Sequence, residues 1–126
     1  LNAIIDQRRK LATRYNNAIM NLKDAIPPKV PSYARTTYQS YVVRFKGKEG
    51  KAQKIANYLK ENGVDTRPGI MCAHHEPPYS ENWPKGSLPE SELATQETLI
   101  LPLFPGMTEE EQERVLTALE DAVKLN

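Results

Sequence analysis

"TLILPLFPGMTEEEQERVLTALE", residues 98–120, combines a strand, a turn and the start of a helix in one run. The apolar residues at its beginning predict a short buried strand that ends at a proline. Pro105-Gly106 predicts a turn. Thr108 and Glu111 match the capping box, in which each side chain bonds the other residue's free amide. The predicted helix turns four apolar residues inward: Val115, Leu116, Leu119 and Val123.

The segments before this run alternate between helical and strand patterns. Apolar residues spaced by three and four predict a first helix over residues 1–26, ended by the prolines that follow. "TYQSYVVRF", residues 37–45, predicts a strand of about eight residues with apolar side chains on one face. Residues 52–63 predict a second helix that stops at Asn62-Gly63, and residues 64–67 predict a short strand.

Residues 68–97 contain five of the ten prolines and few periodic apolar positions. We therefore expect a long irregular loop here, and loops of this length are usually functional or disordered. The order of elements is α-β-α-β-loop-β-α. It predicts an α+β fold in which a small, mainly antiparallel sheet of about three strands packs against helices.

The composition narrows the class of protein. A length of 126 residues corresponds to one domain. The net charge of +1 gives no support for nucleic acid or an anionic membrane as a partner, and no apolar run is long enough for a membrane span. A single cysteine cannot form an internal disulfide, so a cytoplasmic location is expected.

"GIMCAHHEPPY", residues 69–79, gathers residue types that bind metals or attack substrates. A zinc site would use Cys72, His74 and His75, but adjacent histidines in an extended chain point to opposite sides, so no metal is expected. A nucleophilic thiol would need His74 as its base. No glycine turn that could form an oxyanion site lies beside Cys72, so a packing role is expected.

Four stretches together resemble the C-terminal domain of the sugar-nucleotide aminotransferases, the DegT/DnrJ/StrS family of pyridoxal-phosphate enzymes with the aspartate aminotransferase type of fold. The stretches are "RRKLATRYNNAI" (8–19), "TYQSYVVRF" (37–45), "VDTRPGIMCAHHEPPY" (64–79) and "LILPLFPGMTEEEQERVLTALE" (99–120). The last is the most specific, because family members tend to end with this strand, turn and Thr-capped helix.

The resemblance implies that residues 1–126 are the small domain of a larger enzyme, with residues 1–26 as the connecting helix. The absent large domain would hold pyridoxal 5'-phosphate and its lysine, so this chain alone is expected to be inactive. The parent is expected to be a homodimer. It would transfer an amino group, from glutamate, to a nucleotide-linked keto sugar.

The resemblance also assigns substrate-binding residues and leaves the catalytic ones outside this chain. The family's His-x-Glu-Pro-x-Tyr element falls on residues 74–79. The assigned residues are His74, Glu76, Tyr79, Arg67 and Tyr38. Two positions depart from the family pattern: Gln39 stands where many relatives have histidine, and Pro68 where many have a basic residue.

Two other interpretations stay open. The chain can be a free-standing α+β module that binds a ligand or regulates a partner, which its domain-like length favours. Alternatively, the parent has lost its lysine and acts as a regulator or a dehydratase-like relative. Because Leu1 already begins in helical periodicity with no capping residue before it, we interpret the chain as part of a longer protein.

Overall fold

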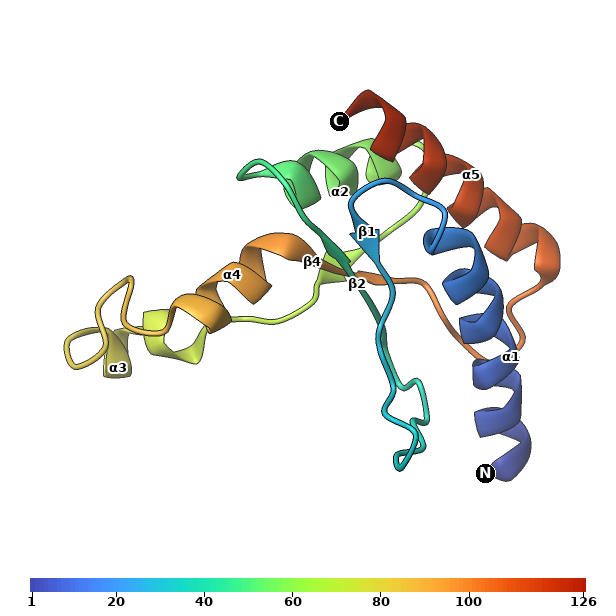
Figure 1. The fold of residues 1–126 in the computed structure, drawn as a ribbon, viewed down its shortest axis with the longest axis horizontal. Coiled ribbons are helices and arrows are strands. Elements are labelled where there is room, and N and C mark those ends of the chain that lie inside the picture. Colours follow the sequence, from blue (N-terminus) through green and yellow to red (C-terminus); the bar gives the residue numbers. More distant parts are fainter.

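The computed structural model describes residues 1–126 as an antiparallel sheet with helices packed around it, and the expected α+β class is confirmed (Figure 1). The elements are α1 (Asn2–Ile19), β1 (Ala25–Ile26), β2 (Tyr41–Phe45), α2 (Lys51–Glu61), β3 (Arg67–Pro68), the short 3-10 helix η1 (Ala73–His75), α3 (Pro77–Ser80), α4 (Pro89–Glu97), β4 (Thr98–Leu101) and α5 (Glu109–Leu125).

The sheet has four strands in the order β1-β2-β4-β3, and every neighbouring pair is antiparallel. The sheet therefore has one strand more than the expected number of about three. The additional strand, β1, pairs with the end of β2. Because β1 has only two residues, it is too short to show a periodic pattern in the sequence. Likewise, the first helix ends at Ile19 rather than at residue 26. The strand predicted over residues 37–45 begins only at Tyr41, since Tyr38 has a φ of 47° and cannot continue a strand.

The core lies on the face of the sheet covered by α1, α2 and α5. In β2, the residues Tyr41, Val43 and Phe45 are buried and alternate with partly exposed ones, as predicted. The rings of Tyr15 on α1 and Tyr41 lie 4.9 Å apart. Both phenols are hydrogen-bonded, Tyr15 to the carbonyl of Pro102 at 2.7 Å and Tyr41 to Oδ1 of Asn16 at 2.6 Å. The largest buried side chains are thus also satisfied polar groups.

Helix α5 begins as the sequence predicts. The side chain of Thr108 accepts from the amide of Glu111, whose carboxylate accepts from the amide of Thr108 in return. Gln112, one turn further on, is buried and donates to the carbonyl of Leu11 at 2.7 Å. This bond ties α5 to α1, and the two helices lie next to each other in Figure 1.

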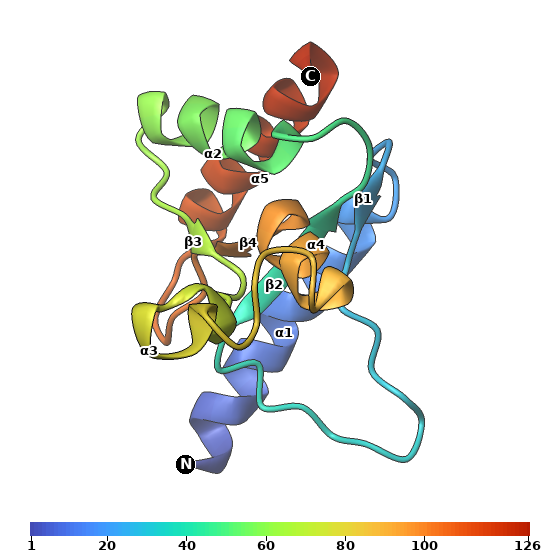
Figure 2. The ribbon, with the colours of Figure 1, turned by 90° about the vertical axis from the view of Figure 1, so that its left-hand side faces the viewer.

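Residues 69–97, which we call the arm, leave the sheet after β3 and return to it at β4. The arm holds η1, α3 and α4, so the expectation of an irregular loop was wrong for much of its length. Figure 1 shows the arm projecting away from α1 and α5, and in Figure 2 the arm faces the viewer. Helix α4 was missed because it has no apolar stripe, although it begins with Pro89 and has two acidic residues in its first turn.

Candidate functional site

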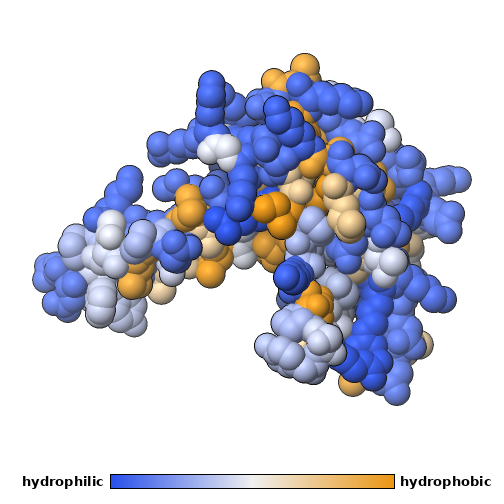
Figure 3. Space-filling model, in the orientation of Figure 1, coloured by the Kyte–Doolittle hydropathy of each residue, from blue (hydrophilic) through white to orange (hydrophobic).

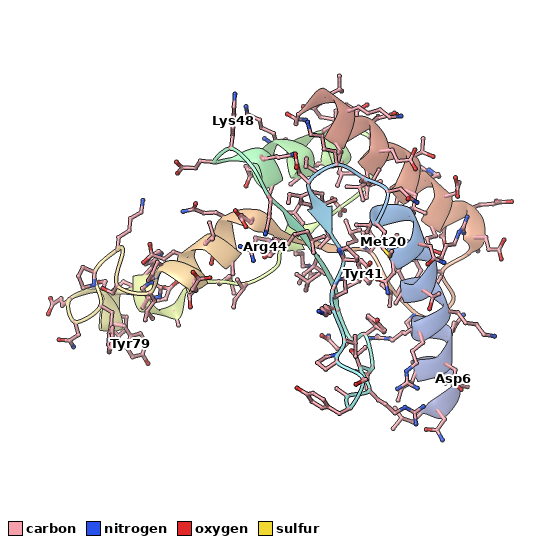
Figure 4. The ribbon with its side chains drawn as sticks, viewed as in Figure 1. Asp6, Met20, Tyr41, Arg44, Lys48 and Tyr79 are labelled. Carbon is pink, nitrogen blue, oxygen red and sulfur yellow. The ribbon has the colours of Figure 1, made fainter.

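The five residues assigned by resemblance fall into two groups. Arg67 lies on β3, and Tyr38 precedes β2, where its ring stacks 6.1 Å from that of Tyr41. His74, Glu76 and Tyr79 lie in the arm. Figure 4 shows Tyr79 toward the far end of the arm, well away from Tyr41 on β2. The structure therefore does not bring the five side chains together within this chain.

A hollow of about 750 Å³ lies beside Arg67. It is bounded by the residues before β2, the segment that leads into β3, the end of β4 with the segment after it, and the start of α5. Gln39 and Ser40 line it together with Arg67 and Arg114, and no sequence pattern singles out Arg114. Neither arginine takes part in an ion pair within the chain. Their guanidinium groups can each donate paired hydrogen bonds to a carboxylate or phosphate.

His74 is buried, with 7% of its surface exposed, and is held by α4. Its Nε2 lies 3.1 Å from Oε1 of Glu92, which also accepts from the amide of Gly86 at 2.7 Å. The bond from His74, and then that from Gly86, hold the pKa of the Glu92 carboxyl below its usual value. Because an ionised carboxylate only accepts, the Nε2 of His74 carries the proton.

Glu76 and Tyr79 face solvent, in contrast to His74. Tyr79 is 55% exposed, and other apolar residues of the arm are exposed with it. They are Ile70, Met71, Trp83, Leu88 and Leu93. Figure 3 shows apolar surface where the arm meets the rest of the molecule. An apolar surface of this kind is typical of a region that another domain or subunit covers.

At η1, the side chains of three residues lie close together: Cys72, His74 and His75. The ligand atoms of the three side chains all lie within 4.8 Å of one another, and the two imidazole rings are 4.3 Å apart. The expectation that the adjacent histidines point to opposite sides was wrong, since residues 73–75 form a 3-10 turn instead of an extended chain. Cys72 is buried, with its Sγ 2.9 Å from Oγ1 of Thr95 on α4.

None of the helices is both long and apolar enough to cross a membrane.

Comparison with solved structures places the whole chain within larger aminotransferases. TlmJ from Streptoalloteichus hindustanus is 26% identical with a TM-score of 0.88, and the match covers 99% of this chain and 33% of TlmJ. The PLP form of a putative sugar aminotransferase, Spr1654 from Streptococcus pneumoniae, is 13% identical with a TM-score of 0.87, covering 98% of this chain and 32% of Spr1654. This chain thus spans about a third of the length of such neighbours.

A third solved structure also has a fold similar to that of this chain. PseC from Helicobacter pylori, an aminotransferase involved in the biosynthesis of pseudoaminic acid, is 12% identical with a TM-score of 0.84, and the match covers 99% of this chain and 34% of PseC. At such low identity, PseC and Spr1654 show the fold alone. The family model of the DegT/DnrJ/EryC1/StrS aminotransferases matches residues 1–120. Because that match extends over nearly the whole chain, this chain belongs to the DegT/DnrJ/EryC1/StrS aminotransferase family.

Proposed function

We propose that this chain is the C-terminal small domain of a sugar aminotransferase that transfers an amino group from glutamate to a nucleotide-linked keto sugar. The observation that carries the proposal is the family match over residues 1–120, supported by the superposition of 99% of the chain on a third of TlmJ. In this proposal the chain closes the substrate side of an active site whose catalytic residues belong to the parent's large domain.

Aminotransferases of this family use pyridoxal 5'-phosphate. When bound, the cofactor supplies the electron sink for the transfer. The one buried lysine of this chain, Lys51, already pairs with Asp24 at 3.0 Å and does not line the hollow. We therefore propose that the lysine that binds the cofactor covalently belongs to the parent's large domain. The residues of this chain would instead bind the substrate.

In the hollow, Arg67 is the residue suited to an anionic part of the substrate. It is exposed, has no ion-pair partner and can form two parallel hydrogen bonds with a carboxylate or phosphate. Gln39 and Ser40 beside it can exchange hydrogen bonds with sugar hydroxyls. Because Gln39 carries no ionisable group, it can orient a substrate but cannot move a proton as a histidine would.

In the arm, we assign direct substrate contact to Glu76 and Tyr79 and a positioning role to His74. Glu76 immediately precedes α3, and Tyr79 lies on it. The bond between His74 and Glu92 joins the turn before α3 to α4 across 18 residues of sequence. Loss of this bond would therefore leave Glu76 and Tyr79 without a fixed position.

The parent is proposed to be a cytoplasmic homodimer. Its location is supported by the single, buried and unpaired cysteine. Association with a second subunit is supported by the exposed apolar residues of the arm, which a partner surface would cover.

The test uses the full-length parent enzyme. His74→Ala should lower kcat for transamination of the sugar by about tenfold or more while the bound cofactor stays near one equivalent.

Arg67→Gln should raise KM for an anionic substrate by about tenfold, the value of one charged hydrogen bond. Lys60→Gln removes the same charge from an exposed position on α2 and serves as the matched control, with no expected change in KM.

Two results would contradict the proposal. One is a full-length protein that binds the cofactor yet shows no absorbance change with glutamate. The other is an Arg67→Gln enzyme whose KM equals that of the Lys60→Gln control. Tight binding of a small ligand by the 126-residue chain on its own would instead favour the free-standing module.

A further inference from the structure

Every cysteine and histidine in the chain belongs to one cluster. The chain has one cysteine and two histidines, and the ligand atoms of Cys72, His74 and His75 all lie within 4.8 Å of one another. The proposed transamination uses neither the thiol nor His75. The cluster is therefore a chemical feature that the function of the parent leaves unexplained.

The separations in this cluster are close to those of a tetrahedral metal site. Zinc bonds of about 2.0 Å to nitrogen and 2.3 Å to sulfur place neighbouring ligand atoms roughly 3.3 to 3.7 Å apart. The three ligand atoms here all lie within 4.8 Å of one another. Side-chain rotations that bring them together by about 1 Å would complete the geometry.

Glu92 provides a second, independent feature of a metal site. Its carboxylate lies 3.1 Å from Nε2 of His74 and 3.6 Å from Nε2 of His75. The amide of Gly86 fixes the same oxygen at 2.7 Å. A carboxylate that accepts from one imidazole nitrogen leaves the other as an unprotonated ligand, and this arrangement recurs behind metal-binding histidines. In His74, that second nitrogen is Nδ1.

We propose that Cys72, His74 and His75 bind one divalent transition-metal ion, zinc in preference to magnesium or calcium. A thiolate and two imidazoles suit zinc, whereas the harder ions prefer oxygen ligands. Glu92 is occupied in orienting the imidazoles, so three protein ligands leave a fourth position for water. The half-exposed side chain of His75 gives the ion a path from solvent.

Binding has a defined proton balance and a local consequence. The thiol of Cys72 donates to the carbonyl of Ser91 at 3.4 Å. The ion replaces that proton, which passes to solvent, and the thiolate becomes a ligand. Three of the four residues in 72–75 are then joined through one ion. The turn that precedes α3 is held more rigidly as a result.

The test is a titration of the reduced, metal-free chain, Leu1 to Asn126, with CoCl2 alone, followed by ZnCl2. Cobalt at a tetrahedral site with a thiolate gives visible d–d bands and a near-ultraviolet charge-transfer band. We expect both to saturate at one equivalent and to disappear when zinc is added. Cys72→Ser should abolish the charge-transfer band, and His75→Gln should weaken binding by about tenfold or more.

The variants are chosen so that failure to fold is not mistaken for loss of binding. His75 is 39% exposed at its side chain, so His75→Gln should keep the native circular dichroism spectrum. Glu76→Gln removes an exposed carboxylate next to the cluster and should leave cobalt binding unchanged. The proposal is overturned if wild type gives no band at one equivalent, or if His75→Gln binds cobalt as tightly as Glu76→Gln does.

Discussion

Gly69 is the residue at which the arm leaves the sheet, and its lack of a side chain sets how closely the arm can pass β4. A Cβ built at Gly69 would lie 2.1 Å from Oγ1 and 2.5 Å from Cβ of Thr98, and 3.0 Å from Cγ1 of Val42. The amide of Gly69 donates to the carbonyl of Thr98 at 3.1 Å. Any other residue would have to push these strands apart or give up that bond.

We expect Gly69→Ala to lower the free energy of unfolding by about 1 to 3 kcal/mol, the usual cost of overpacking. Urea unfolding followed by circular dichroism measures the effect. The control is Thr98→Gly, alone and combined with Gly69→Ala. If the steric account holds, the alanine costs much less in the Thr98→Gly background, and equal costs in both backgrounds would contradict it.

At the candidate site, the sequence suggested residues but not the contacts that those residues make. The resemblance selected His74 and Arg67, and the structure places Arg67 beside a hollow. It did not select Glu92, because the bond to His74 spans 18 residues and exists only once α4 folds back on η1. The cluster of Cys72 with His74 and His75 was missed for a related reason: whether adjacent side chains converge depends on backbone dihedrals that composition does not fix.

At the scale of elements, helix α5 shows what a local signal can specify. Thr108 caps the helix through its bond from the amide of Glu111 at 3.1 Å. We expect Thr108→Ala to cost about 1 kcal/mol of stability in chemical denaturation, as is typical of a lost N-cap. Thr117→Ala is the control, because Thr117 is exposed within the same helix and alanine has the higher helix propensity. A Thr108→Ala protein as stable as Thr117→Ala would show that the cap contributes nothing.

Elements whose stability is local were predicted, and elements that depend on distant partners were not. Helices α2 and α5 and the buried face of β2 have periodic apolar residues that indicate their structure directly. Strand β1 consists of Ala25 and Ile26 and exists because these residues pair with Phe45 and Arg44. Helix α4 is held partly by an ion pair at 2.5 Å between its last residue, Glu97, and Arg44, which is 53 residues away in the sequence.

At the scale of the whole molecule, the arm and the stabilising core occupy different regions. The core lies between the sheet and α1, α2 and α5, while the arm extends from the opposite side (Figure 1). The buried set of the core includes no residue of the arm. Substitutions at exposed positions of the arm, such as Glu76, should therefore report on binding without unfolding the domain.

The two buried phenols of the core make global stability depend on pH in the alkaline range. Burial raises the pKa of Tyr15, and burial followed by the neighbouring phenols Tyr38 and Tyr15 raises that of Tyr41. In the unfolded chain these phenols ionise near about pH 10. Above that pH the unfolded chain loses protons that the folded chain keeps, so stability is complete below it and falls as pH rises toward the folded pKa. The loss is at most about 1.4 kcal/mol per pH unit for each phenol.

Urea unfolding of the chain at about pH 9 and about pH 11 measures this loss across the unfolded pKa. At the lower pH, Tyr15→Phe should be less stable than wild type, because it loses the hydrogen bond to the carbonyl of Pro102. Between the two pH values, however, its free energy of unfolding should fall by less than that of wild type. Tyr33→Phe is the control, because it removes a phenol that is 91% exposed and outside the core. The quantity compared is the change in stability between the two pH values in each variant. Equal losses in Tyr15→Phe and Tyr33→Phe would mean that the Tyr15 phenol is not shielded from water in the folded chain.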